Sequence, residues 1–200
     1  AIDVSSACYD TINYWLEPVT FDLGWRKYMA EAVKKVVSVP VLAANLIRTP
    51  EQAEQQLQEG VQDFISLGRP LLADPYWAKK AEEGRSEDIK RCICCLNCFE
   101  TMEKNAYVLG HGECAINPVL GREKANNELP SDGNGRLVTV IGAGPSGLTA
   151  AETLLRRGFK VVVIEKASEV GGQLRLAEKP PKKDKIAWCY EDLKTSVIKL

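Results

Sequence analysis

A strand–turn–helix–strand pattern near the C-terminal end constrains the fold of this chain more than any other feature. A buried strand is predicted at residues 137–141 (LVTVI), and the motif G-x-G-x-x-G follows directly at residues 142–147 (GAGPSG). A helix up to Arg157 and a second strand at residues 160–164 then lead to Glu165. Such a unit binds the pyrophosphate of a dinucleotide at the start of its helix. We therefore predict that a Rossmann-like nucleotide-binding domain begins here.

The same pattern identifies the residues of the candidate nucleotide site. The glycines whose backbone would line the pyrophosphate are Gly142, Gly144 and Gly147. Glu165 ends the second strand, where a carboxylate can accept hydrogen bonds from a ribose and disfavours a 2′-phosphate, so NADP is not expected here. A second close approach of the backbone to the nucleotide is expected at Gly172 and Gln173.

The second strong pattern is a cluster of cysteines, with four of the seven cysteines inside residues 92–98. The spacing C-x2-C-x2-C-x15-C is formed by Cys92, Cys95, Cys98 and Cys114. Three thiols from one tight turn and a fourth from a distant segment favour a 4Fe–4S cluster, with an all-cysteine zinc site as the alternative. Disulfides fit less well, because the number of cysteines is odd and no secretory signal is visible. Cys94 is left out because it breaks the even spacing, and His111 is expected to be a loop residue.

Residues 1–90 alternate between apolar strands and helices at the rhythm of a parallel α/β fold, including the eightfold barrel. Strands are expected at residues 2–6, 39–44 and 62–67, and helices at 22–37, 49–60 and 74–84. Ligands of such barrels bind at the C-terminal ends of the strands, which here carry Asn45, Gly68 and Arg69. Gly68 and Arg69 could hold a phosphate through backbone N–H groups and a guanidinium. The alternative is that Gly68 only turns the chain and that Arg69 lies at the surface.

Composition excludes several other classes of partner. The formal net charge of −1 and the pI of about 6.0 give no electrostatic basis for binding nucleic acid or an anionic membrane. No apolar run has the length of a membrane span, so a cytoplasmic location is expected. Both ends of the sequence suggest an internal piece of a longer protein, which we expect to be inactive by itself.

The motifs, taken in order, resemble the multidomain flavin oxidoreductases related to old yellow enzyme. This group includes 2,4-dienoyl-CoA reductase, 2-enoate reductase, bile-acid oxidoreductases and trimethylamine dehydrogenase. The resemblance implies that residues 1–90 are the C-terminal part of an FMN-binding TIM barrel and that residues 91–125 form an iron–sulfur segment. It further implies a linker at residues 126–136 and the start of a Rossmann-like FAD/NAD(P)-binding domain at residues 137–200.

The resemblance also implies roles for individual residues. Gly68 and Arg69 match positions that bind the FMN phosphate, whereas Leu46 stands where the family often has arginine. The positions that match FAD contacts of the reductases are Ser146, Glu165, Gln173 and Lys183. Tyr9 lies near the position of a proton donor and is interpreted either as that donor or, with slight preference, as an aromatic wall of the pocket.

The implied activity is the reduction of an activated carbon–carbon double bond in a small unsaturated substrate. Electrons would pass from NADH through FAD and the 4Fe–4S cluster to FMN. The alternative is an amine dehydrogenase resembling trimethylamine dehydrogenase, in which electrons leave through the cluster. The resemblance leaves homo-oligomerisation of the full-length protein open.

Overall fold

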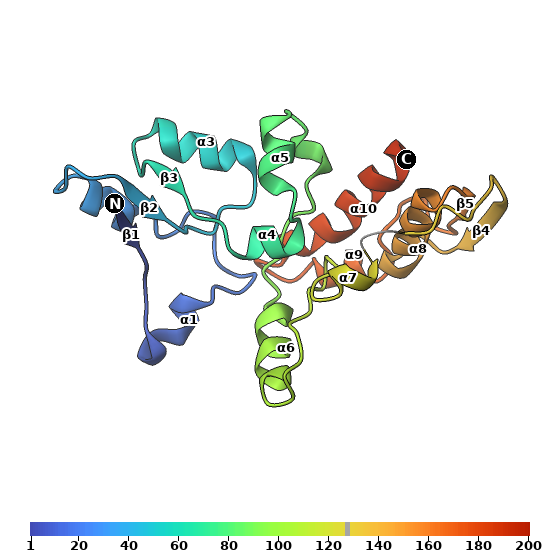
Figure 1. Cartoon of the computed structure of the whole chain (residues 1–200), viewed down its shortest axis with the longest axis horizontal. Coiled ribbons are helices and arrows are strands. Elements are labelled where there is room, and N and C mark those ends of the chain that lie inside the picture. The colour runs from blue at the N-terminus through green and yellow to red at the C-terminus, as the bar shows by residue number, and fades with distance from the viewer. Residues whose placement is uncertain (127–128) are drawn as a thin grey trace. The chain divides into compact units, whose positions relative to one another are not determined.

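The computed structural model describes residues 1–126 and 129–200, which separate into two compact units, Ala1–Leu96 and Asn97–Leu200. Each unit contains its own parallel sheet and is described by itself (Figure 1). In the part of the chain that the structure describes, no helix combines the length and apolar character needed to cross a membrane.

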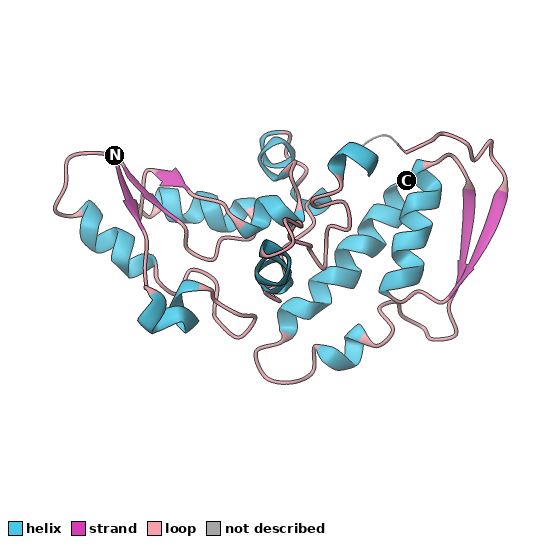
Figure 2. Cartoon of the chain, turned by 60° about the horizontal axis from the view of Figure 1, so that its bottom comes forward, coloured by secondary structure: helices cyan, strands magenta, loops and turns pink. Residues whose placement is uncertain are grey.

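The first unit is built on a three-stranded parallel sheet in the order β1-β2-β3 (Figure 2). The strands are β1 (Ile2–Val4), β2 (Val41–Ala43) and β3 (Phe64–Ile65). The register pairs Ile2 with Val41 and Leu42 with Phe64. Consecutive parallel strands joined by helices are the repeat unit of a β/α barrel, so this sheet agrees with the predicted α/β class.

Helices connect the strands and complete two small cores. They are α1 (Ile12–Trp15), α2 (Lys27–Lys34), α3 (Pro50–Gln58), α4 (Arg69–Ala73) and α5 (Trp77–Glu82), with short 3₁₀ turns at η1 (Tyr9–Thr11) and η2 (Ser86–Asp88). One core gathers around Val41 and Val61, and the other packs Ile47 and Ile89 against Trp77. Helix α2 packs against β1 and β2. Within the sheet, Val41 and Ala43 of β2 are buried, whereas Phe64 of β3 is 56% exposed.

Two boundaries of the first unit differ from the sequence prediction. The helix expected from Asp22 begins only at Lys27, because Gly24 adopts a left-handed φ of +69° and the backbone N–H of Arg26 donates to the side chain of Asn45. The third strand is limited to Phe64–Ile65, and the expected loop after it forms α4. By contrast, α3 lies within the predicted range 49–60, and its start is capped by the Thr49 hydroxyl, which accepts from Gln52 N at 3.2 Å.

The second unit places helices around a two-stranded parallel sheet. Its elements are α6 (Asn97–Ala106), α7 (Glu123–Asn126), β4 (Leu137–Ile141), α8 (Pro145–Arg156), β5 (Lys160–Ile164), α9 (Leu174–Ala177), η3 (Asp184–Ile186) and α10 (Ala187–Lys199). Both strands lie where the sequence predicts them, paired in parallel from Leu137–Lys160 to Ile141–Ile164. Helix α8 packs against β5 on one side and α10 on the other (Figures 1 and 2).

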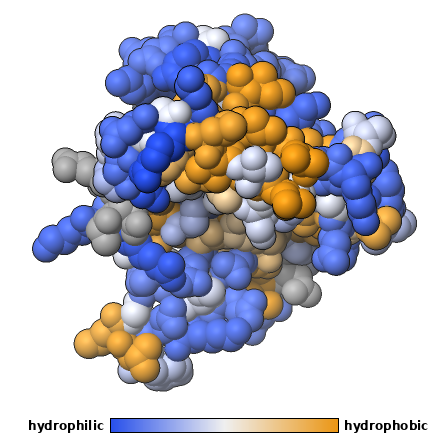
Figure 3. Space-filling model, turned by 90° about the vertical axis from the view of Figure 1, so that its right-hand side faces the viewer, coloured by the Kyte–Doolittle hydropathy of each residue, from blue (hydrophilic) through white to orange (hydrophobic). Residues whose placement is uncertain are grey.

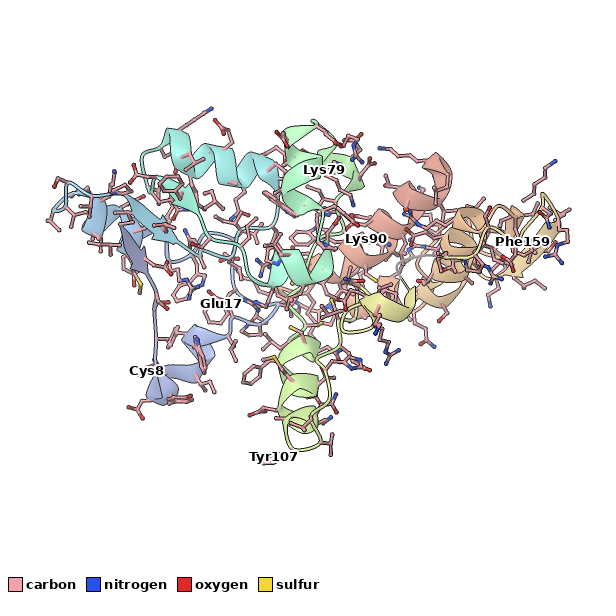
Figure 4. The ribbon with its side chains drawn as sticks, viewed as in Figure 1. Cys8, Glu17, Lys79, Lys90, Tyr107 and Phe159 are labelled. Atoms are coloured by element: carbon pink, nitrogen blue, oxygen red, sulfur yellow. The ribbon has the colours of Figure 1, made fainter. Side chains whose placement is uncertain are left out.

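The expected linker at residues 126–136 lies partly outside the described residues, because 127 and 128 are not described. Its end is hydrogen-bonded to the segment between α8 and β5: the N–H groups of Gly133 and Gly135 donate to the carbonyls of Arg157 and Gly158. Arg136 and Arg157 also lie 5.0 and 5.5 Å from the ring centre of Phe159, labelled in Figure 4.

One face of the β4–β5 sheet is apolar and exposed to solvent. Its apolar side chains are Leu137, Ile141, Val162 and Ile164, beside Thr139 and Lys160 on the same face. They contribute to the hydrophobic surface seen in Figure 3, which views the side of the molecule that carries this sheet. The opposite face, which bears Val163, contacts the core of the unit formed by Ala143, Leu148 and Leu193.

Candidate functional site

The strand ends of the first unit carry a buried cluster of ionic groups. The Glu17 carboxylate, in the loop between α1 and α2, is 1% exposed (Figure 4). One of its oxygens lies 2.9 Å from Arg26 Nη1, and the other accepts from Arg69 Nη2 at 2.6 Å. Arg69 also donates to the Glu17 carbonyl at 2.7 Å. Arg69, predicted to bind phosphate, is therefore held in place by a buried carboxylate rather than lying loose at the surface.

Arg26 extends this cluster across the ends of two strands. Its guanidinium donates to Ser6 Oγ at 2.6 Å and to the Ala44 carbonyl at 3.0 Å, so it joins the segments that follow β1 and β2. Burial, opposed by Glu17, lowers the pKa of Arg26, and the positive charges of Arg69 and Arg48 act in the same direction as burial. The positive charges of Arg26, Arg48 and Arg69 thus act on one another. The buried Glu17 carboxylate pairs with two of them, Arg26 and Arg69.

This region fits an anionic ligand, although the predicted contacts to a flavin remain predictions. Around Gly68, no atom lies within 4 Å of the position that a Cβ would occupy, so open space adjoins the backbone beside Arg69. Surplus positive charge and an accessible glycine backbone are the features that bind a phosphate.

The other residues predicted for this region have different surroundings. Asn45 is 1% exposed and uses its amide internally, since it accepts from Arg26 N and donates to Gln56 Oε1 at 3.1 Å. Leu46 is also buried, with a left-handed φ of +50°. Tyr9 is 83% exposed, and its ring meets Trp15 edge-on at 5.4 Å, so its role as donor or wall stays a prediction.

The cysteine loop follows the last helical turn of the first unit and adopts a tight, irregular backbone. Cys94 and Leu96 both have left-handed φ values, +58° and +62°, on either side of Cys95. Such values are unfavourable for residues other than glycine and are concentrated at ligand-binding sites. The turn therefore has the sharp curvature that a run of closely spaced ligands requires.

Arg48 reaches this loop from the end of β2. Its Nε and Nη2 donate to Cys94 Sγ at 3.3 and 3.2 Å. A hydrogen bond from the Cys94 side chain lowers the pKa of Cys92 to about 7, with the charge of Arg48 assisting and burial opposing the shift. For Cys94 itself, its hydrogen bond with Cys92 and its burial raise the pKa. Cys92 is thus the thiol of this pair more readily ionised, as a metal ligand must be.

In the second unit, hydrogen bonds fix the return of the chain towards the start of α6. Asn97 Nδ2 and Thr101 Oγ1 both donate to the Glu113 carbonyl, at 3.1 and 3.4 Å, and Glu113 N donates to Thr101 Oγ1 at 2.7 Å. Cys98 lies in the first turn of α6, and Cys114 directly follows Glu113. Cys98 and Cys114, two predicted ligands with fifteen residues between them, therefore lie on segments that are hydrogen-bonded to each other.

His111 has a structural role in this loop. Its Nε2 accepts from Arg122 Nε at 3.3 Å, and its carbonyl accepts from Asn105 Nδ2 at 2.7 Å. The ring packs so tightly on Gly121 that a Cβ there would lie 2.3 Å from it. These contacts agree with the prediction that His111 is a loop residue.

Within residues 1–126 and 129–200, no three histidine, cysteine or acidic side chains are grouped so that they could hold a metal ion. Cys92 and Cys95 belong to the first unit, and Cys98 and Cys114 belong to the second. The four-cysteine centre therefore stays a prediction from the spacing of the cysteines. The tight turn around Cys95 in the first unit and the hydrogen bonds beside Cys98 and Cys114 in the second are compatible with it.

The glycine motif of the second unit forms a close-packed turn between β4 and α8. A Cβ at Gly147 would lie 1.9 Å from the Gly142 carbonyl oxygen, so only glycine fits there. Glu165 directly follows β5 and accepts from Ala143 N at 2.7 Å and Ala167 N at 3.0 Å. These backbone donors lower the pKa of Glu165, so the carboxylate is ionised at neutral pH beside the glycine turn.

The second glycine pair approaches this turn. Gly171 N donates to the Ala143 carbonyl at 2.8 Å, and a Cβ at Gly172 would lie 3.2 Å from Gly144 Cα. The predicted site residues Gly142, Gly144, Glu165 and Gly172 are thereby brought together. Ser146, Gln173 and Lys183 are exposed, and their predicted contacts with FAD stay predictions.

Comparison with known proteins matches one segment of each unit to a family model. Residues 4–88 match the model of the NADH:flavin oxidoreductase / NADH oxidase family, and residues 140–188 match that of an NAD(P)-binding Rossmann-like domain. The chain belongs to the NADH:flavin oxidoreductase / NADH oxidase family. The named proteins of this family that it resembles are oxidoreductases.

Relatives of the flavin oxidoreductase family align along almost the whole chain. The NADH oxidase of Thermoanaerobacter brockii is 43% identical over 94% of this chain and 28% of its own length. The cinnamate reductase of Clostridium sporogenes is 33% identical over 90% of this chain and 28% of its own length. The structure of histamine dehydrogenase from Rhizobium sp. 4-9 superposes with a TM-score of 0.86 at 27% identity, covering 98% of this chain and 28% of that protein. The chain thus spans less than a third of these relatives.

Sequence reasoning missed three residues of the first unit that the structure brings into the site region: Glu17, Arg26 and Arg48. A signal for Glu17 exists, because it is a lone acid within an aromatic and apolar stretch. No comparable pattern distinguishes Arg26 or Arg48 from the other basic residues of the chain.

Proposed function

We propose that this chain is part of an NADH-dependent flavin oxidoreductase that reduces an activated carbon–carbon double bond. The observation that carries the proposal is the order of three sites along one chain: a basic strand end, a cysteine loop and a glycine turn. The similarity to an NADH oxidase and a cinnamate reductase supports the nicotinamide donor and an unsaturated acid-type substrate.

In this proposal each site holds one redox group through its own residues. Gly68 and Arg69 hold the FMN phosphate, with Glu17 fixing the guanidinium. The cluster ligands are Cys92, Cys95, Cys98 and Cys114. The glycine turn and Glu165 hold the pyrophosphate and ribose of FAD. When bound, the flavins and the 4Fe–4S cluster supply hydride and single-electron transfer, which side chains cannot perform.

The amine dehydrogenases are the second candidate class. The superposition on histamine dehydrogenase favours them, and a dimethylamine dehydrogenase of Hyphomicrobium is 29% identical over 78% of this chain. We rank this class second because the NADH oxidase is 43% identical over a larger share of the chain.

Anaerobic reduction of the full-length holoprotein distinguishes the two classes. We expect excess NADH to bleach the flavin absorbance and a cinnamate-type acid to restore it. Flavin that stays oxidised with NADH but is bleached by a methylated amine would contradict the reductase and support the amine dehydrogenase.

A further inference from the structure

Arg48 is a buried arginine whose position is fixed on every side. Its side chain is 3% exposed, and Nη1 donates to the Ile47 carbonyl at 2.7 Å while Nε and Nη2 contact Cys94 Sγ. Its backbone N–H donates to Gln52 Oε1 at 2.9 Å, and its carbonyl accepts from Trp77 Nε1 at 3.2 Å. The guanidinium therefore cannot turn towards solvent without breaking its hydrogen bonds to Ile47 and Cys94.

The charge of Arg48 has no carboxylate partner among the residues that the structure describes. Arg26 and Arg69 share Glu17, and the partly buried Lys80 pairs with Asp74 at 2.5 Å. Arginine remains protonated in proteins, and burial of an unpaired charge is strongly unfavourable. A fold that keeps this guanidinium buried is expected to place an anion near it.

Cys94 shows where that anion would lie. It is 1% exposed, and its Sγ is directed at Arg48, while its neighbours Cys92 and Cys95 are the predicted ligands of the first unit. A cluster with four thiolate ligands is anionic and becomes more so on reduction. It would supply the missing counter-charge beside Arg48.

We propose that Arg48 is the counter-charge of the iron–sulfur centre and that Cys94 anchors its guanidinium instead of binding iron. The proposal rests on the proposed function, because it requires that the cysteine loop holds a cluster. A fixed positive charge stabilises the reduced, more negative state of a cluster more than its oxidised state. Arg48 therefore raises the reduction potential of the centre.

The test is an EPR-monitored redox titration of the anaerobically purified holoprotein, with iron and acid-labile sulfide measured on the same samples. In Arg48→Met we expect the equilibrium constant for cluster reduction to fall about tenfold, a shift of about 59 mV to more negative potential for one electron. Arg48→Lys keeps the charge and should stay within about threefold of the wild type. Arg85→Met removes an exposed arginine of the same unit and should leave the potential unchanged.

Each outcome decides the proposal. An unchanged potential in Arg48→Met with full iron content would overturn it, as would loss of the cluster in both Arg48 variants. Loss of the cluster in Arg48→Met with retention in Arg48→Lys would support it, because only the charge distinguishes the two. A wild-type protein without iron and sulfide would contradict the proposed function itself, and this inference with it.

Discussion

At the scale of single residues, buried charges organise the candidate site. Glu17 pairs with two arginines through its two carboxylate oxygens; Arg26 directly precedes α2, and Arg69 begins α4. Trp25 Nε1 adds a third contact to the same carboxylate at 3.4 Å. Removing one partner from such a buried network leaves charges without compensation, which costs far more than breaking an exposed pair.

Glu17→Gln tests this network. The variant keeps the shape of the side chain but leaves Arg26 and Arg69 without a counter-charge, so we expect the free energy of unfolding to fall by about 3 kcal/mol. Because Arg69 then loses its fixed orientation, FMN should also be lost more readily on gel filtration. Urea denaturation and flavin absorbance measure the two effects.

Glu59→Gln is the matched control, since it breaks the exposed pair between Glu59 and Lys27. Little change in stability or FMN content is expected from it. Equal effects of the Glu17 and Glu59 variants would show that the buried network has no special role.

At the scale of elements, the strand–turn–helix–strand unit from β4 to β5 could be predicted from sequence almost to the residue. Its signals are local: an apolar run, glycines where a side chain would collide, and an acid at the end of β5. The start of α2 could not be predicted, because the contact that stops the helix comes from Asn45, nineteen residues away. The same reason hid the Arg48–Cys94 contact, which joins residues 46 positions apart.

Gly147→Ala tests the turn of this unit. Its methyl group would meet the Gly142 carbonyl oxygen, so the turn must open, at a cost of about 1–3 kcal/mol in stability. FAD should then be lost, while FMN, which we propose is bound by the other unit, should be retained. Cofactors released by heat and separated by chromatography measure this directly.

Ala150→Ser, at an exposed position of the same helix α8, is the control and should retain both flavins. Retention of FAD by Gly147→Ala would show that the glycine turn does not hold the nucleotide. Loss of both flavins would show that the two sites do not bind independently.

At the scale of the whole molecule, two units with separate cores are joined within the cysteine segment itself, between Leu96 and Asn97. Two predicted ligands lie on each side of that boundary. The spacing of the cysteines along the sequence predicts which four thiols are ligands. It does not predict how the two units are arranged. Metal binding commonly provides that last step, because ligands are assembled as the site forms.

The most direct measurement is the EPR spectrum of the dithionite-reduced, full-length holoprotein, with iron and acid-labile sulfide determined on the same sample. We predict the signal of a reduced 4Fe–4S cluster with about four irons and four sulfides per chain. Replacing any of Cys92, Cys95, Cys98 or Cys114 by alanine should abolish it, whereas Cys8→Ala, Cys94→Ala and Cys189→Ala should retain it. An EPR-silent protein containing zinc and no sulfide would contradict the account.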